Sequence, residues 1–411
     1  MFLSDYFPTG TCYFYGYPAG EDESFFNKVP VAIEELVAAR ANCCAGSGLD
    51  VINFAATNSP IVDQDLLDIL SIPGTYNNSI KLLPQEIGLD VHGKSRNEAI
   101  MKVLANNLAP GSLVMAQPFI DDNIKNLYQI PAELISWLND KDSMTQFLNH
   151  KFMPKRYAKF QSGEEFINES SDIKLPYVVK ISSSSSGDGV YICHKIGQLE
   201  STRNKLKDFV GTIIVEQYIP IIKNYALHFG ISWDESRDID FIGINEQLTT
   251  DQGDFLGGII NSTNLPDNLL EIKDYIFKDL LVKIRKMGWY GVGGLDVILD
   301  EHNNAYIIDC NFRMTGMTAY HFLISQNKIE APIVSFMAEL KGSKEVFKEK
   351  ILPYFSKYTD NKIGQIIALS HHEDSWYFNG SLSYKNREVL KMNSKILLDL
   401  GVESGTLLKL V

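Results

Sequence analysis

Acidic side chains occur at matched positions on two neighbouring segments near the middle of the C-terminal half. The segments GGLDVILD, ending at Asp300, and AYIIDCNF, beginning at Ala305, have the apolar pattern of strands, and the residues between them are typical of a turn. If residues 301–304 are the loop of a β-hairpin, Asp300 pairs with Ala305. Counting back along both strands then places Asp296 opposite Asp309.

Two carboxylates on one face of a hairpin predict a cation between them, because facing like charges are destabilising. Asn311 lies two residues beyond Asp309 and therefore points to the same face. Hard oxygen ligands of this kind suit Mg²⁺. Arg313 continues the face and adds a planar donor for a carboxylate or phosphate. The alternative is an ordinary hairpin whose acids are solvated.

A second candidate site is the serine and glycine run between YVVKI and VYICHK. Both flanking segments have the pattern of strands, and the connection contains five serines followed by Gly-Asp-Gly. Glycines let the backbone approach an anion, and serines supply donors without bulk. Such a loop is suited to cover a phosphate group. Lys180 lies on the strand that enters the loop, where its charge can reach the same phosphate. The alternative is a flexible serine-rich linker.

A third candidate is the end of the strand GTIIVEQYIP, where Glu216, Gln217, Tyr218 and Ile219 precede a proline. A strand that stops at proline leaves backbone groups that can read the edge of a purine, although a plain edge strand has the same pattern. Lys141 precedes a further helical segment and, taken alone, is expected to be a solvated surface residue.

The remaining elements must position these groups. Residues 1–135 alternate strand-like and helical segments, which predicts an open α/β layer. A long amphipathic helix with isoleucine or leucine at 272, 276, 280 and 284 ends at Gly288 and leads into the hairpin. We expect a mobile glycine-rich loop at 252–263 and a helix at 329–342. The last sixty or so residues are expected to be short strands, including 406–411, around one helix.

Composition excludes several classes of protein. The chain has 411 residues with 45% hydrophobic and 22% charged residues, which is typical of a globular protein with two or three domains. Its net charge of −13 argues against nucleic acid as a partner. No apolar run approaches the length of a membrane span, and the five cysteines form no metal or disulfide pattern. We expect a cytoplasmic protein with reduced thiols.

The order of these motifs resembles the ATP-grasp superfamily over residues 136–325. The resemblance implies an N-terminal α/β (pre-ATP-grasp) layer, then a two-subdomain α+β ATP-grasp fold with antiparallel sheets and a small C-terminal α+β extension. The expected domains are 1–135, 136–210 with the phosphate loop, 211–330 with the metal site, and 331–411.

The resemblance also implies roles for individual residues. Arg313, Lys180 and Ser186 are expected to be catalytic, and Asp296, Asp309 and Asn311 match the metal ligands. The residues expected to bind ATP are Lys141, Lys180, Ser183, Ser184, Ser185, Ser186, Gly187, Gly189, Glu216, Gln217, Tyr218, Ile219 and Asn224.

This sequence departs from the family pattern at Lys223 and Asn224, at Gly294 and at Asp309. Lys223 and Asn224 stand where many members have an acidic residue for the ribose, and Asn224 can still hydrogen-bond a ribose. Gly294 replaces an arginine of some ligases, and Asp309 is shorter than the commoner glutamate. The N-terminal layer and the YxIP and WLNDK segments are loosely similar to peptide ligases of natural-product pathways, of the pheganomycin type.

The implied activity is ATP-dependent, ADP-forming ligation of a small-molecule carboxylate to the amine of an amino acid or peptide, through an acyl phosphate. ATP and Mg²⁺ are the expected cofactors, with two metal ions, for which Mn²⁺ could substitute; no membrane partner is expected, and a homodimer is left open. Two alternatives remain: a catalytically silent ATP-binding regulatory protein, and an ATP-grasp enzyme with a non-amine acceptor. We further expect the loops at 182–189 and 251–260 to close when ligand binds.

Overall fold

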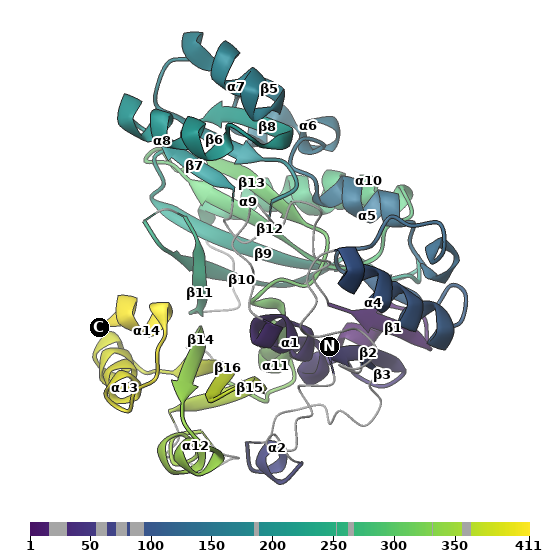
Figure 1. The fold of residues 1–411 in the computed structure, drawn as a ribbon, viewed down its shortest axis with the longest axis vertical. Coiled ribbons are helices and arrows are strands. Elements are labelled where there is room, and N and C mark those ends of the chain that lie inside the picture. Colours follow the sequence, from purple (N-terminus) through teal and green to yellow (C-terminus); the bar gives the residue numbers. More distant parts are fainter. Residues whose placement is uncertain are drawn as a thin grey trace.

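The computed structural model describes most of the chain. The described residues are 1–15, 31–54, 64–70, 80–82, 94–184, 189–251, 253–261, 267–330, 332–355 and 363–411. Within them the strands form three sheets (Figure 1).

The N-terminal layer is a parallel sheet with the strand order β3-β2-β1-β4. Its strands are β1 (Thr11–Phe14), β2 (Leu49–Phe54), β3 (Ile80–Leu82) and β4 (Leu113–Met115). Its helical elements are η1 (Leu3–Tyr6), α1 (Val31–Ala39), η2 (Arg40–Cys44), α2 (Gln64–Leu70), α4 (Lys94–Asn107) and η5 (Lys125–Leu127). Every residue of β1 is buried, as parallel sheets covered on both faces require. The predicted α/β layer is confirmed.

A second sheet is antiparallel, with the order β5-β8-β6-β7. Its strands are β5 (Arg156–Ser162), β6 (Tyr177–Ile181), β7 (Val190–Cys193) and β8 (Val210–Gln217). Its helical elements are α7 (Gly163–Glu169), η7 (Ser170–Asp172) and α8 (Ile196–Leu206). The preceding α5 (Ala132–Asn139), α6 (Met144–Phe147) and η6 (His150–Phe152) pack instead against the large sheet described next. Helices α7 and α8 cover one face of this sheet at one end of the molecule (Figure 1).

The third and largest sheet has eight strands in the order β13-β12-β9-β10-β11-β14-β16-β15. The strands are β9 (Lys223–Ile231), β10 (Asp240–Thr249), β11 (Phe255–Ile260), β12 (Gly291–Leu299), β13 (Ala305–Asn311), β14 (Ile333–Lys341), β15 (Gly364–His372) and β16 (Ser375–Ser383). The predicted long helix packs on it as η8 (Asp267–Leu269), α9 (Leu270–Tyr275), a π-helical turn (Ile276–Leu280) and α10 (Leu281–Lys286). The remaining helices are α11 (Thr318–Ser325), α12 (Lys344–Lys350), α13 (Arg387–Asp399) and α14 (Gly405–Leu410).

The hairpin is confirmed, but its register near the turn differs from the prediction by one residue. Leu299, not Asp300, is the partner of Ala305. A β-bulge beside Asp296 then shifts the register by one residue, so that Asp296 is the partner of Asp309, as predicted. The prediction reached the right pair because the bulge compensates for an error at the turn.

Three predicted elements are wrong. Residues 255–260, expected in a mobile loop, form β11, whose glycines are required by close packing: a Cβ at Gly257 would lie 2.4 Å from the Ser335 carbonyl oxygen. Residues 333–341, expected to be helical, form β14 between β11 and β16. Residues 406–411 were expected to be a strand, but α14 begins after Ser404, whose side chain accepts from the Leu407 amide.

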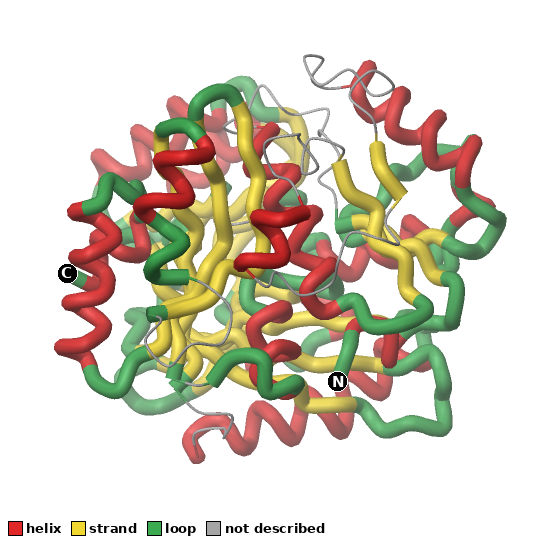
Figure 2. Tube along the Cα trace, turned by 90° about the horizontal axis from the view of Figure 1, so that it is seen from below, coloured by secondary structure: helices red, strands yellow, loops and turns green. Residues whose placement is uncertain are grey.

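The N-terminal layer is docked on the large sheet through a shared core. Helix α1 and η2 contact β15, and η2 also lies against α11. Buried residues of η2, including Ala41 and Cys44, pack with Ala319 and Phe322 of α11. Figure 2 shows the N-terminal strands beside the larger sheet rather than continuous with it. This docking brings the carboxyl end of β1 toward the centre of the molecule.

Two further properties bear on the sequence-based expectations. All five cysteines are unpaired and buried. In the described parts of the chain, no helix combines the length and the apolar character needed to cross a membrane.

Candidate active site

A cavity of about 290 Å³ lies where the three sheets converge. It brings together most of the residues singled out from the sequence. These are Lys141, Lys180, Glu216, Gln217, Tyr218, Ile219, Asn224, Asp296, Asp309, Asn311 and Arg313. The cavity has an apolar end between the two antiparallel sheets and a polar end next to the N-terminal layer.

Asp296 and Asp309 face each other across β12 and β13 inside this cavity. Burial, together with the negative charge of Asp309, raises the pKa of Asp296 to about 7. Nε2 of Gln247, on β10, donates to Oδ1 of Asp296 at 2.7 Å and partly offsets this rise. Gln247 was not found from the sequence, since nothing in β10 indicates which of its residues faces the hairpin.

Lys141 is buried, and the expectation that it is a solvated surface residue is wrong. Its amide donates to the Ser182 carbonyl oxygen at 3.2 Å, which fixes the turn before α6 against β6. Its Nζ donates to the carbonyl oxygen of Ser184 and lies 3.7 Å from Oδ2 of Asp309. Lys141 therefore connects the serine loop to the acid pair.

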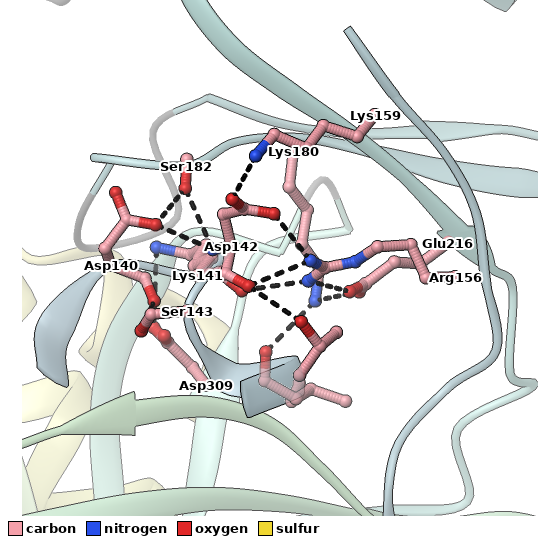
Figure 3. A network of polar contacts seen from close by, with 12 residues as sticks. Asp140, Lys141, Asp142, Ser143, Arg156, Lys159, Lys180, Ser182, Glu216 and Asp309 are labelled. Atoms are coloured by element: carbon pink, nitrogen blue, oxygen red, sulfur yellow. Dashed lines mark hydrogen bonds and ion pairs between the residues drawn. The ribbon is translucent and has the colours of Figure 1, made fainter. Parts of the chain in front are cut away.

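Lys180 and Glu216 form the centre of a buried ion network (Figure 3). Nζ of Lys180 lies 2.8 Å from Oε2 of Glu216, and Arg156 reaches Oε1 of the same carboxylate at 3.2 Å. Burial alone would raise the pKa of Glu216, but the charges of Lys180 and Arg156 outweigh burial and hold it below its ordinary value. Arg156 also bonds Asp142, at 2.9 Å, which joins β5 to the turn that carries Lys141.

The serine loop is described at its two ends. Ser184 is buried and Ser183 is exposed. Gly189 has φ +76°, and a Cβ there would lie 2.9 Å from the Ser184 Cβ, so the loop closes only with glycine at this position. Ser185, Ser186 and Gly187, which were also predicted to belong to this site, lie outside the described residues.

The apolar end of the cavity is a slot next to the end of β8. Strand β8 ends at Gln217, and the following Tyr218 and Ile219 line the slot. Its other walls are apolar residues of both antiparallel sheets: Val178, Val190, Ile192, Ile298 and Ile308. A flat, apolar slot bordered by a strand end can accept a purine ring.

Asn224 lines this part of the cavity. Its buried Oδ1 has no hydrogen-bond partner among the described residues. Buried acceptors are rarely left without a donor, so a ligand hydroxyl would satisfy it. The neighbouring Lys223 bonds Glu246 instead, with its Nζ 2.9 Å from Oε1.

The polar end of the cavity is built by Arg313 and the N-terminal layer. Nη1 of Arg313 donates to the hydroxyl oxygen of Tyr15 at 3.2 Å. Arg40, the first residue of η2, places its guanidinium carbon 5.8 Å from the centre of the Tyr15 ring. Sequence reasoning missed both Tyr15 and Arg40. The available signal was the position of Tyr15 just after β1, since ligands bind at the carboxyl ends of parallel strands.

The departure at Gly294 has a steric reason in this chain. A Cβ at Gly294 would lie 2.9 Å from Cγ2 of Thr315. An arginine therefore could not be accommodated at position 294 without moving Thr315, which also lines the cavity.

The residues present fit Mg²⁺ and a nucleotide. Within the described residues, no cluster contains three or more histidine, cysteine or acidic ligands. The candidate metal ligands are instead Asp296 and Asp309 with the amide of Asn311, an all-oxygen set suited to Mg²⁺. A divalent cation would offset the repulsion that raises the pKa of Asp296.

Comparison with known proteins supports the same interpretation. Residues 154–311 match the family model described as "L-aspartate–L-methionine ligase, ATP grasp". Similar solved structures include an ADP complex of N5-carboxyaminoimidazole ribonucleotide synthetase, with a TM-score of 0.58 and 12% identity over 95% of this chain and 96% of that chain. Another is biotin carboxylase from Campylobacter jejuni, with a TM-score of 0.53 and 12% identity over 96% of this chain and 92% of that chain. A third is L-amino acid ligase from Bacillus licheniformis, with a TM-score of 0.52 and 13% identity over 96% of this chain and 98% of that chain.

At these identities the structural likeness shows the fold. The chain shares its overall fold with these three structures over nearly its whole length, and residues 154–311 match the ATP-grasp ligase family model. The predicted resemblance and fold class are confirmed.

Proposed function

We propose that this protein is an ADP-forming carboxylate–amine ligase that joins two amino acids, or an amino acid and a peptide, through an acyl phosphate. The observation that supports the proposal most directly is the convergence of an acid pair, two lysines and an arginine in one cavity. Binding of ATP alone would not require Arg313 next to the acid pair.

In this proposal the nucleotide lies along the cavity from the apolar slot to the acid pair. Tyr218 and Ile219 border the adenine, and Asn224 accepts from a ribose hydroxyl. Lys141 and Lys180 neutralise phosphate charge, as positively charged side chains do in phosphoryl transfer. Glu216 keeps Lys180 in position, since both oxygens of its carboxylate already accept from cations.

The proposed chemistry takes place next to the hairpin. Mg²⁺ held by Asp296, Asp309 and Asn311 would neutralise the transferring phosphate. The carboxylate of one substrate attacks the γ-phosphorus, and ADP leaves. In this proposal Arg313 holds the acyl phosphate by two parallel hydrogen bonds. The amine of the second substrate then forms the C–N bond as the acyl C–O bond breaks, which releases phosphate and one proton.

The domain boundaries predicted from the sequence are retained as part of the proposal. Residues 136–210 and 211–330 would grip the nucleotide, and residues 1–135 would contribute to the substrate end. Strands β14, β15 and β16 of the last segment extend the large sheet, so this segment would support the site rather than form a separate layer.

The test is ADP release from the purified protein with Mg-ATP. L-aspartate and L-methionine are the first pair to test, because the matching family model carries their names. Pools of the other amino acids and of dipeptides follow. Asp309→Asn should abolish the signal, whereas the matched control Asp274→Asn, which removes only a surface ion pair with Lys278, should retain it.

The outcomes separate the candidate functions. ADP release that requires both an amine and Asp309 supports the ligase. ADP release with a carboxylate alone supports an ATP-grasp enzyme with a non-amine acceptor. Tight ATP binding without ADP release in any pool would contradict the proposal and favour an ATP-binding regulatory protein.

A further inference from the structure

Among the described residues, four cationic side chains line the cavity, and Arg40 differs from the other three. Lys141 lies 3.7 Å from an oxygen of Asp309, and Lys180 lies 2.8 Å from an oxygen of Glu216. Arg313 lies near Asp296, one of the acid pair, on which its charge acts. Arg40 makes no ion pair with any described acidic residue, and its buried Nε has no hydrogen-bond partner there. A guanidinium that faces a cavity without an acidic partner is suited to an anionic ligand.

Three features of its surroundings position Arg40. It is the first residue of η2, between the fully buried Ala39 and Ala41. Its guanidinium lies over the ring of Tyr15, with the central carbon 5.8 Å from the ring centre, within the range of a cation–π contact. Its Nη1 also passes close to Gly316, where an added Cβ would lie 3.4 Å away.

Tyr15 contacts both arginines at this end of the cavity. Its ring lies beneath Arg40, whereas its hydroxyl oxygen accepts from Arg313. The two arginines therefore contact different parts of Tyr15, Arg40 the ring and Arg313 the hydroxyl oxygen. They offer two anion-binding groups from different parts of the chain: Arg313 follows the hairpin of the acid pair, and Arg40 belongs to the N-terminal layer.

We propose that Arg40 binds the unreacted carboxylate of the acceptor, which makes the acceptor an α-amino acid or a peptide with a free carboxylate. This inference rests on the proposed ligase function. The attacking amine must be neutral, so the carboxylate is then the main charge of the acceptor. Its burial requires a cationic partner. The planar fork of arginine fits a carboxylate with two hydrogen bonds.

Chain geometry favours the acceptor over the donor. In an α-amino acid the amine and the carboxylate share one carbon, so an amine that attacks the acyl carbon beside Arg313 carries its carboxylate only a short distance away. The reacting carboxylate of the donor is held at Arg313 and the acid pair, and the unreacted carboxylate that a donor such as L-aspartate also carries is distinguished from that of the acceptor by the KM for L-aspartate in the test below. Arg40 then acts as a binding residue that orients the nucleophile.

The test compares acceptors that differ only in the carboxylate. The probes are L-methionine and L-methioninamide, with L-aspartate as donor and Mg-ATP. Hydroxylamine, which intercepts acyl phosphates as hydroxamates, serves as a reference acceptor without a carboxylate. The variants are Arg40→Met and Arg40→Lys. The exposed Arg387, outside the cavity, gives the matched control Arg387→Met.

We expect the parent protein to prefer L-methionine to its amide by on the order of 100-fold in kcat/KM, the size of a lost hydrogen-bonded charge pair. The Arg40→Met variant should lose most of this preference, Arg40→Lys part of it, and Arg387→Met none. In each Arg40 variant, the rate with L-methionine divided by the rate with hydroxylamine should fall to the same extent as the preference for L-methionine over its amide.

Each other outcome would contradict the inference. Unchanged discrimination in Arg40→Met, with ADP and hydroxamate still formed, would overturn the role of Arg40 and leave the ligase function intact. A raised KM for L-aspartate alone would place Arg40 on the donor and overturn the assignment to the acceptor. No ADP with any amino acid or with hydroxylamine would overturn the ligase function and this inference with it.

Discussion

The hydroxyl oxygen of Tyr15 accepts a hydrogen bond from Nη1 of Arg313 at 3.2 Å, although 298 positions separate the two residues. The bond joins the end of the first parallel strand to the hairpin that carries the acid pair. It makes the N-terminal layer part of the site. The position of the arginine proposed to hold the acyl phosphate therefore depends on a residue from another part of the chain.

Tyr15→Phe tests this dependence. The change removes the hydroxyl and keeps the ring beneath Arg40, so we expect kcat for ADP release to fall about tenfold, the effect of one hydrogen bond to a charged group. The KM for ATP should change little, because the nucleotide binds at the other end. Tyr290→Phe removes a comparable bond, to Gln129 at 3.2 Å, and is the matched control. Equal effects of the two substitutions would contradict the prediction.

A second prediction concerns the ion network of Figure 3. Glu216→Gln leaves Lys180 and Arg156 without their shared carboxylate in a buried position, which we expect to lower the free energy of unfolding by about 3 kcal/mol. Lys159→Met removes an exposed partner of Asp142 from the same network and should cost less than about 1 kcal/mol.

Urea unfolding followed by circular dichroism measures both changes. Similar losses for the two variants would mean that burial of the Lys180–Glu216 pair does not determine its contribution. ATP binding, measured by calorimetry, should weaken in Glu216→Gln and not in Lys159→Met.

A third prediction concerns pH. Burial and Asp309 raise the pKa of Asp296 to about 7, above its ordinary value of 3.8. The folded state then binds more protons than the unfolded state between these two values, so this carboxyl makes the metal-free protein less stable as the pH rises from 4 to 7. The buried His228 has a pKa lowered to about 4 and acts in the opposite direction, so the overall profile mixes both effects.

The contribution of Asp296 is isolated by comparison with Asp296→Asn. Without Mg²⁺, the free energy of unfolding of the parent relative to this variant should fall by at least about 1 kcal/mol between pH 5 and pH 7. Saturating Mg²⁺ should reduce the fall, because the ion stabilises the ionised pair. Parallel stability profiles for the two proteins would rule out a raised pKa at Asp296.

The sequence was most informative where the interacting residues lie close together in the chain. Asp296 and Asp309 belong to one hairpin, so counting along two strands was enough to place them opposite each other. The bulge that corrected the register was not predictable, because no residue between Asp296 and Asp309 marks it.

Contacts between distant segments could not be predicted in the same way. The burial of Lys141 depends on β6 and β13, and the approach of Arg40 to Tyr15 depends on how the N-terminal layer docks. Strand β14 was predicted as a helix because its sequence, read alone, suits either structure. This segment forms a strand because it pairs with β11 and β16, and the residues of those strands lie elsewhere in the chain.

The last prediction concerns Asn224, which replaces an acidic residue of the family pattern. Its buried Oδ1 has no partner among the described residues, so a ribose hydroxyl should supply one. Asn224→Ala should raise the KM for ATP about tenfold, and the increase should be much smaller with 2′-deoxy-ATP if the 2′-hydroxyl is the donor. Lys223→Ala, which removes only the bond to Glu246, should leave both values near those of the parent. An equal increase for both nucleotides in Asn224→Ala would instead assign the interaction to the 3′-hydroxyl, and no increase for either would remove Asn224 from the nucleotide site.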